Sequence, residues 1–114
     1  MPLPNNTFTI ANGASVSTVN AKGSKPFTKL FVENHNAGAT LFAEISRDGI
    51  TYRNLSVYQP EIAAPTVPVI VAFATGAANF AISIEPWLFS NINFLRFTSN
   101  QSISAPGGCT ITLY

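Results

Sequence analysis

Short runs of β-branched and aromatic residues, separated by Gly, Pro, Asn and Asp, constrain this chain more than any other feature. No window of a dozen residues carries an apolar stripe at helical spacing with charges on the opposite side. The pattern therefore predicts an all-β fold, and 114 residues are enough for one domain. We expect a single antiparallel β-sandwich over residues 1–114, jelly-roll-like and of about eight strands. Within it, residues 1–25 are expected to form an extended N-terminal arm or an edge hairpin.

The alternation within each run predicts where the strands lie and which side chains face inward. In the run 93–98, Leu95 and Phe97 are expected to face the core together. Asp48-Gly49 is the strongest turn signal, because this pair supplies the positive φ that a tight hairpin requires. Residues 69–84 are expected to hold two buried strands joined by a turn at 76–79. The predicted strands are Thr7–Ile10, Ser15–Val19, Phe27–Glu33, Thr40–Ser46, Ile50–Leu55, Val69–Thr75, Phe80–Glu85, Asn93–Thr98 and Cys109–Tyr114.

The chain is apolar but carries very little charge. Hydrophobic residues make up 46% of it, yet it has six Lys/Arg and five Asp/Glu, for a net charge of +1. This balance excludes intrinsic disorder and a nucleic-acid partner bound through a basic surface. The uncharged stretch Ile62–Ile84 is interrupted by Pro, Gly, Asn and Thr, so it predicts strands and no membrane span. Because 11 Asn, 11 Thr and 10 Ser supply the polar surface, we expect other molecules to cover part of it.

The residues suited to catalysis are few. His35 is the only histidine and lies between two asparagines, so we expect a loop histidine bonded to backbone or solvent. Cys109 begins an alternating strand and is expected to be a buried structural thiol. One His, one Cys and five scattered acids match no metal-ligand spacing. The sequence therefore predicts a protein that is not an enzyme and takes no cofactor or metal.

Aromatic residues offer one alternative, a sugar-binding surface. Tyr52, Tyr58 and Trp87 are candidates for a stacking platform, with asparagines as hydrogen-bonding partners. In the opposing interpretation, Trp87 plugs one end of the core and the tyrosines shield an edge. Arg53 and Arg96 lie in apolar strands, where they either pair with glutamates across the sheet or reach a partner chain.

Three segments resemble known β-domains. Ala43–Tyr52, which reads AEISRDGITY, resembles the S-x-D-G-x-T-W/Y hairpin of discoidin-like modules and of many tailed-phage virion proteins. Asn93–Phe97 resembles a strand that follows later in those domains, and Gly107–Leu113 resembles the strand that closes many small phage structural proteins. The discoidin-like modules often carry a calcium site and paired cysteines, which this sequence lacks, so lectin activity is not carried over.

The resemblance implies a virion structural protein, assembled in the host cytoplasm. The leading hypothesis is a capsid decoration or cement protein that stabilises the head lattice through multivalent contacts. Its partners would be the major capsid protein or other virion proteins, and a homotrimer is the favoured oligomer. The alternatives are a tail or head–tail connector subunit and a carbohydrate-binding module of a tail tip or fibre.

Two kinds of contact are expected in such an assembly. Exposed edge strands, either the N-terminal strands or Cys109–Tyr114, would extend the sheet of a neighbour. The expected contact residues are Phe8, Ile10, Trp87, Phe89, Arg96 and Tyr114.

Overall fold

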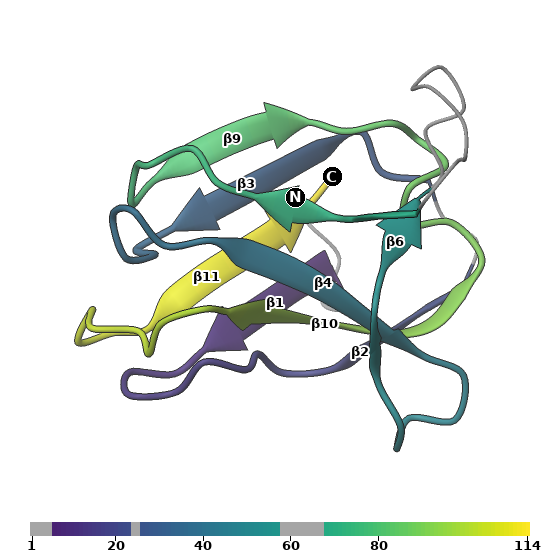
Figure 1. The fold of residues 1–114 in the computed structure, drawn as a ribbon, viewed down its shortest axis with the longest axis horizontal. Coiled ribbons are helices and arrows are strands. Elements are labelled where there is room, and N and C mark those ends of the chain that lie inside the picture. The colour runs from purple at the N-terminus through teal and green to yellow at the C-terminus, as the bar shows by residue number, and fades with distance from the viewer. Residues whose placement is uncertain (1–5, 24–25, 58–67) are drawn as a thin grey trace.

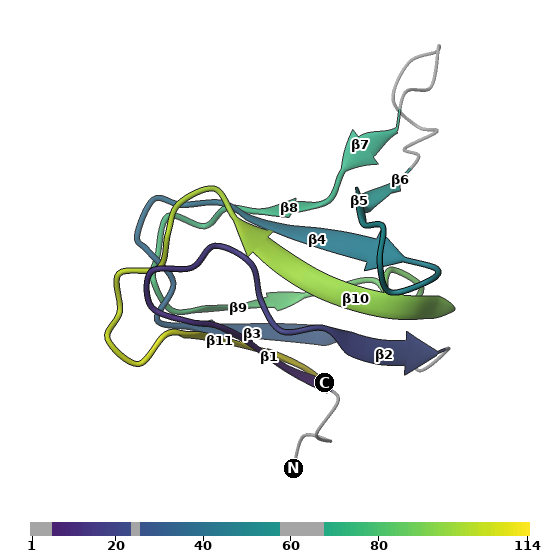
Figure 2. The same ribbon diagram turned by 90° about the horizontal axis from the view of Figure 1, so that it is seen from below.

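Two antiparallel sheets pack face to face in the computed structural model, which describes residues 6–23, 26–57 and 68–114 (Figure 1 and Figure 2). The described residues form strands and turns and no α-helix. The strands are β1 (Thr7–Ile10), β2 (Asn20–Gly23), β3 (Lys29–Glu33), β4 (Leu41–Ser46), β5 (Arg53–Asn54), β6 (Ser56–Val57), β7 (Val69–Ile70), β8 (Ala72–Phe73), β9 (Phe80–Ser83), β10 (Ile92–Ser99) and β11 (Cys109–Leu113). The predicted antiparallel all-β architecture is therefore confirmed.

The strands are divided between two main sheets. Sheet A has the order β1-β11-β3-β9, and sheet B has the order β2-β10-β4-β5, with β8 also pairing with β4. Strands β6 and β7 form a small separate ribbon, which projects away from the sandwich in Figure 2. The described strands exceed the expected number because the expected run 69–75 divides into β7 and β8, and β6 forms just beyond the expected run 50–55. The jelly-roll connectivity stays a prediction.

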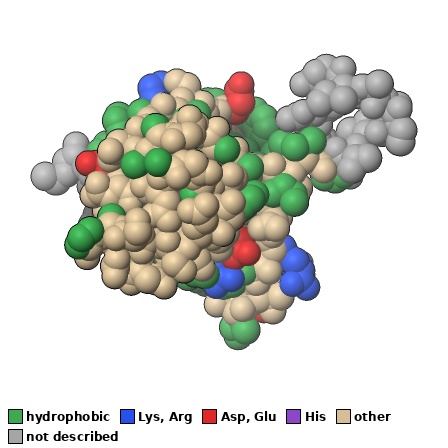
Figure 3. All heavy atoms as spheres, turned by 60° about the vertical axis from the view of Figure 1, so that its left-hand side comes forward, with side chains coloured by type: hydrophobic (Ala, Val, Ile, Leu, Met, Phe, Trp, Pro, Cys, Tyr) green, Lys and Arg blue, Asp and Glu red, His purple; other side chains and the backbone are tan. Residues whose placement is uncertain are grey.

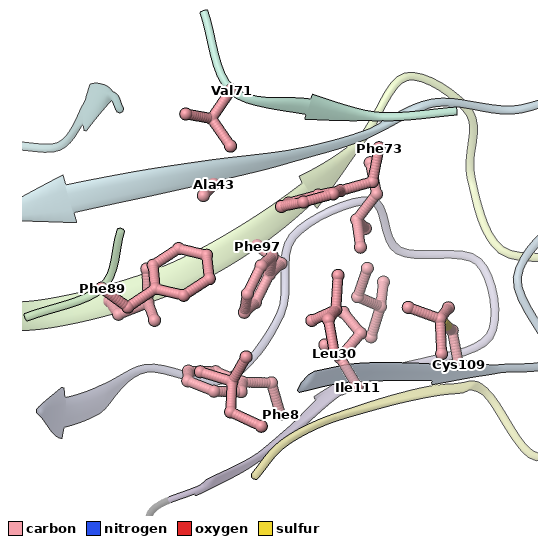
Figure 4. Close-up of a cluster of buried hydrophobic side chains, with 14 of the residues drawn as sticks. Phe8, Leu30, Ala43, Val71, Phe73, Phe89, Phe97, Cys109 and Ile111 are labelled. Carbon is pink, nitrogen blue, oxygen red and sulfur yellow. The ribbon is translucent and has the colours of Figure 1, made fainter. Parts of the chain in front are cut away.

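The core fills the space between the inner faces of the two sheets (Figure 4). Phe97 lies at its centre, with the ring of Phe8 5.0 Å away and the ring of Phe89 5.9 Å away, both edge to face. Leu95 and Phe97 are fully buried, as their spacing in β10 predicted. Aromatic rings packed in this way contribute both buried area and a favourable quadrupole contact.

The prediction of a strand at Ser15–Val19 is wrong. β1 belongs to sheet A and β2 to sheet B, so the residues between them cross from one sheet to the other. Ser17 N donates to Phe97 O at 2.8 Å, but Thr18 N donates to Thr9 O at 3.0 Å. Because the segment changes partner within two residues, it cannot form a regular ladder. The described part of residues 1–25 thus holds one strand of each sheet, β1 and β2.

The expectation of two buried strands within residues 69–84 is also corrected. β8 pairs with β4 in sheet B, and β9 pairs with β3 in sheet A, so the turn at 76–79 connects the sheets. The strands lie at sheet edges, and Val69 and Ile70 are exposed. Within the described ranges, no helix is long and apolar enough to cross a membrane.

The open edges of sheet A differ from those expected. β11 lies between β1 and β3, so Cys109–Tyr114 is central and not an edge. The outer edge of β1 is closed by the following segment, because Thr9 N donates to Thr18 Oγ1 at 3.1 Å and Asn20 Nδ2 donates to Thr7 O at 2.8 Å. In the part of the chain that the structure describes, β9 is the remaining open edge of sheet A.

Candidate functional site

The two ends of the sandwich differ in charge. The loops 11–14, 34–40, 74–79 and 100–108 meet at one end, here called the asparagine end, and contain no Lys, Arg, Asp or Glu. Figure 3 brings this end forward and shows mostly uncharged polar and backbone atoms, with the few charged side chains toward the rim. The opposite end, here called the pocket end, includes the β4–β5 loop and the turn between β9 and β10.

Asparagine side chains tie the loops of the asparagine end to one another. Each amide bonds to the backbone of a different loop, as a substitute for regular strand pairing. The contacts are Asn12 Nδ2 to Ala105 O at 3.1 Å, Asn36 Nδ2 to Ser102 O at 2.7 Å, Ser104 N to Asn36 Oδ1 at 3.0 Å, Asn34 N to Asn79 Oδ1 at 2.9 Å and Thr40 N to Asn100 Oδ1 at 2.9 Å. The sequence signal was the abundance of asparagine in these loops, but the pairings depend on the fold.

His35 is buried beneath this end and is 4% exposed. Its Nε2 lies 2.9 Å from Ser99 Oγ, whereas Nδ1 has no hydrogen-bond partner among the described residues. Burial lowers the pKa of the imidazole, because the charged form would lose its hydration. The expectation of a loop histidine bonded to backbone or solvent is therefore corrected, since its partner is a buried hydroxyl.

Cys109 lies in the core at 0% exposure, as expected of a structural thiol. Burial raises the pKa of the thiol to about 11, so it stays protonated and weakly nucleophilic at neutral pH. Within residues 6–23, 26–57 and 68–114, no three His, Cys, Asp or Glu side chains gather as a metal site would require.

Three of the expected contact residues belong to the core. Phe8 and Ile10 are 0% exposed, and Phe89 is 1% exposed. Phe8 pairs in register with Ile111, which places it on the inner face of sheet A. These three side chains therefore present no surface to a partner. Their assignment as contact residues is corrected, because the apolar side chains of β1 pack in the core between the sheets.

Trp87 and Tyr114 are exposed, at 56% and 46%. Trp87 therefore does not plug the core, and Phe89 from the same turn takes that place. The Tyr114 ring packs edge to face on Phe31, which is 44% exposed, with 5.3 Å between centroids. This pair is an exposed aromatic feature on the outer side of sheet A.

Arg96 lies on the outer face of sheet B and is already paired. Its Nε donates to Glu44 Oε1 at 2.6 Å, and its guanidinium lies 3.9 Å from the centroid of the Tyr52 ring. One face of Tyr52 is thus occupied, and its hydroxyl is buried without a hydrogen-bond partner among the described residues. Tyr58 lies outside the described residues. The structure brings Tyr52 to Arg96, and the platform of Tyr52, Tyr58 and Trp87 stays a prediction.

A pocket that the sequence did not predict opens at the pocket end. Its volume is about 460 Å³, within the range of small-molecule sites. Its lining residues come from the β4–β5 hairpin and from the start of β10: Ile45, Ser46, Arg47, Asp48, Thr51, Arg53, Asn91, Ile92 and Asn93. The available sequence signal was an Asp-Gly turn flanked by two arginines, which we interpreted as a turn alone.

Comparison with known proteins does not assign this chain to a family. No protein-family model matches this chain, and a search of curated proteins finds no match. We therefore base the proposed function on the geometry of the two ends of the sandwich.

Proposed function

We propose that this chain is a non-enzymatic virion structural protein that decorates a capsid and docks through its asparagine end. The observation that supports this is an uncharged end whose loops are bonded to one another before any partner arrives. Docking there desolvates no charge. Ala, Gly, Ser and Asn side chains also lose little rotamer entropy on docking, compared with Lys or Glu.

The placement of the reactive side chains supports a non-enzymatic role. His35 is 4% exposed and Cys109 is 0% exposed, so neither reaches a substrate in solution. A general base must lie within hydrogen-bond reach of the proton it removes. The imidazole of His35 instead contacts Ser99 inside the protein.

The proposal includes self-association, with a trimer as the favoured form. The outer face of sheet A is suited to it, because Thr7 and Thr112 lie in register with Phe31, whose ring forms the exposed pair with Tyr114. Tyrosine is enriched among interface anchors. A head-to-tail contact that closes as a ring joins this face of each copy to a different patch on the next copy.

Reconstitution on particles that lack the protein tests the docking surface. Wild-type chain and two variants are added, one with Ala77→Glu at the asparagine end and one with Ile50→Glu, a matched control at the pocket end. Both sites are exposed. We expect Ala77→Glu to bind about tenfold more weakly, which is a loss of about 1.4 kcal/mol, and Ile50→Glu to bind like wild type. Equal binding of all three chains, or a loss confined to Ile50→Glu, would overturn this docking surface.

Copy number in purified particles separates the virion roles. Hundreds of copies per particle support capsid decoration, whereas about six to twelve copies indicate a tail ring or connector built with cyclic symmetry. Absence from particles overturns the virion proposal. Sedimentation of wild type against Phe31→Ala tests the trimer, and a wild-type monomer at high concentration would contradict it.

A further inference from the structure

The pocket lies at the end of the sandwich opposite the proposed docking surface. One wall is the β4–β5 loop, and the other is the start of β10. Ile92, which is 7% exposed, and the half-buried Ile45 supply its apolar part. A volume of about 460 Å³ accommodates one or two sugar rings.

Local hydrogen bonds hold the wall formed by the β4–β5 loop. Asp48 Oδ1 accepts from Ile50 N at 2.9 Å and from Thr51 N at 3.0 Å. The Ser46 hydroxyl donates to the same oxygen at 2.9 Å, and Gly49 N donates to Ser46 Oγ at 2.9 Å. These bonds fix the loop before a ligand binds, which reduces the entropy lost on binding.

A second contact joins the two walls. Asn93 Nδ2 donates to Arg47 O at 3.2 Å, so the start of β10 holds the loop that carries Arg47. Asn91 beside it has a φ of 57°, a conformation that asparagine tolerates better than most side chains. The pocket is therefore a built feature of this end.

Arg47 and Arg53 provide the positive charge of the pocket. Neither has a carboxylate within ion-pair distance in the part of the chain that the structure describes, whereas Arg96 is paired with Glu44. Asp48 also lines the pocket, but its Oδ1 is occupied by the bonds of its own turn. Two guanidinium groups beside one such carboxylate favour an anionic ligand, and the planar guanidinium matches a carboxylate in a two-point contact.

The neutral lining residues indicate the chemical class of the ligand. Thr51, Asn91 and Asn93 carry hydroxyl and amide groups, which donate to and accept from sugar hydroxyls. Arginine, amides and a small apolar surface together suit a ligand with one carboxylate, several hydroxyls and an apolar ring face. We infer that this pocket binds an acidic saccharide through Arg47 and Arg53. This inference is independent of the proposed capsid role, and it uses residues other than the aromatic set expected from the sequence.

Titration of the full chain by amide NMR tests the inference. The probes are sodium glucuronate, neutral glucose and sodium acetate, which present the whole ligand, the hydroxylated ring and the carboxylate separately. We expect glucuronate to shift the amide signals of 45–53 and 91–93 saturably, with a Kd on the order of millimolar. Glucose and acetate should each bind at least about tenfold more weakly. No saturable shift with glucuronate, or equal binding of either fragment, would overturn the acidic-saccharide assignment.

Charge-neutral variants test the two arginines. Arg47→Gln and Arg53→Gln keep polar side chains at exposed positions, so the folded spectrum should persist. Each is expected to weaken glucuronate binding about tenfold. Lys29→Gln is the matched control, because it removes an exposed cation on sheet A and should leave binding unchanged. Equal binding by all three variants and wild type would overturn the role of the arginines.

Discussion

The asparagine end and the pocket end of this sandwich are both made of loops between strands, but they are held in different ways. At the asparagine end, uncharged amides bond across loops, as Asn36 does to the segment 102–104. At the pocket end, Asp48 bonds mainly within its own loop, and two arginines have no carboxylate partner among the described residues.

This difference shows how a chain with few charges can form two surfaces that suit different kinds of partner. Amides satisfy loop backbone groups without leaving charge at the surface, so the asparagine end is suited to contact with protein. The pocket end concentrates exposed charge in one place, so it is suited to an ionic ligand. Perturbing each end separately tests whether the distinction holds.

The largest effect is expected from Gly108→Ala at the asparagine end. Gly108 has a φ of +81°, and an added Cβ would lie 2.7 Å from Ile10 O. We expect the free energy of unfolding to fall by about 2–3 kcal/mol, measured by urea denaturation. Gly38→Ala is the control, because Gly38 has a φ of +80° but no neighbour within 4 Å, and it should cost about 1 kcal/mol. Equal losses in the two variants would show that β1 and the 105–108 turn are not closely packed.

Asn36→Ala should have the next largest effect. Its amide bonds to Ser102 O and accepts from both Ser104 N and Ser104 Oγ, so several contacts disappear at once. We expect a loss of about 1–2 kcal/mol in the free energy of unfolding. Asn93→Ala at the pocket end removes one bond to Arg47 O and should cost about 0.5–1 kcal/mol. A larger loss for Asn93→Ala would reverse the comparison of the two ends.

Lowering the pH should reduce the free energy of unfolding, because His35 is buried beneath the asparagine end. Burial lowers the pKa of His35 in the folded state below its ordinary value of 6.5, so the unfolded chain binds the proton more readily. The contribution of His35 to the free energy of unfolding is then fully present above about pH 6.5. It falls as the pH drops toward the folded pKa, by at most about 1.4 kcal/mol per pH unit. Urea denaturation at several pH values measures this slope. His35→Gln should remove it, and a slope that persists in that variant would assign the effect to another group.

The smallest effect is expected at the pocket end, from Asp48. Hydrogen bonds from Thr51 N, Ile50 N and the Ser46 hydroxyl lower the pKa of this carboxyl from 3.8 to about 2. Its contribution is therefore present above about pH 4 and is lost as the pH falls through about 2. NMR titration of the amide signals of Ile50 and Thr51 should show a midpoint near 2. A midpoint near 4 would mean that the loop is not bonded as described.

Much of the fold could be predicted from local patterns. Alternation located β1, β4, β10 and β11, and it identified Leu95 and Phe97 as core residues. The Asp-Gly pair correctly indicated a positive φ at Gly49, which is 79°. It did not indicate the length of the loop, because β4 and β5 resume pairing only at Ile45 and Arg53.

Pairing between distant segments could not be predicted in this way. Ser15–Val19 carries a strand-like pattern, but its bonds go to Phe97 in one sheet and Thr9 in the other. Trp87 and Phe89 are neighbours in one turn, and the packing of Phe89 on Phe97 determines which of them is buried. The pocket likewise requires that residues 91–93 meet the loop after β4.

The sequence by itself determined the class of fold, the scarcity of charge and the positions of most strands, because these depend on side-chain period and composition. The tertiary structure decided that the uncharged loops gather at one end while Arg47 and Arg53 line a pocket at the other. The physical reason is that strand order and register, which bring distant residues together, depend on the packing of the whole core and not on any local run of residues.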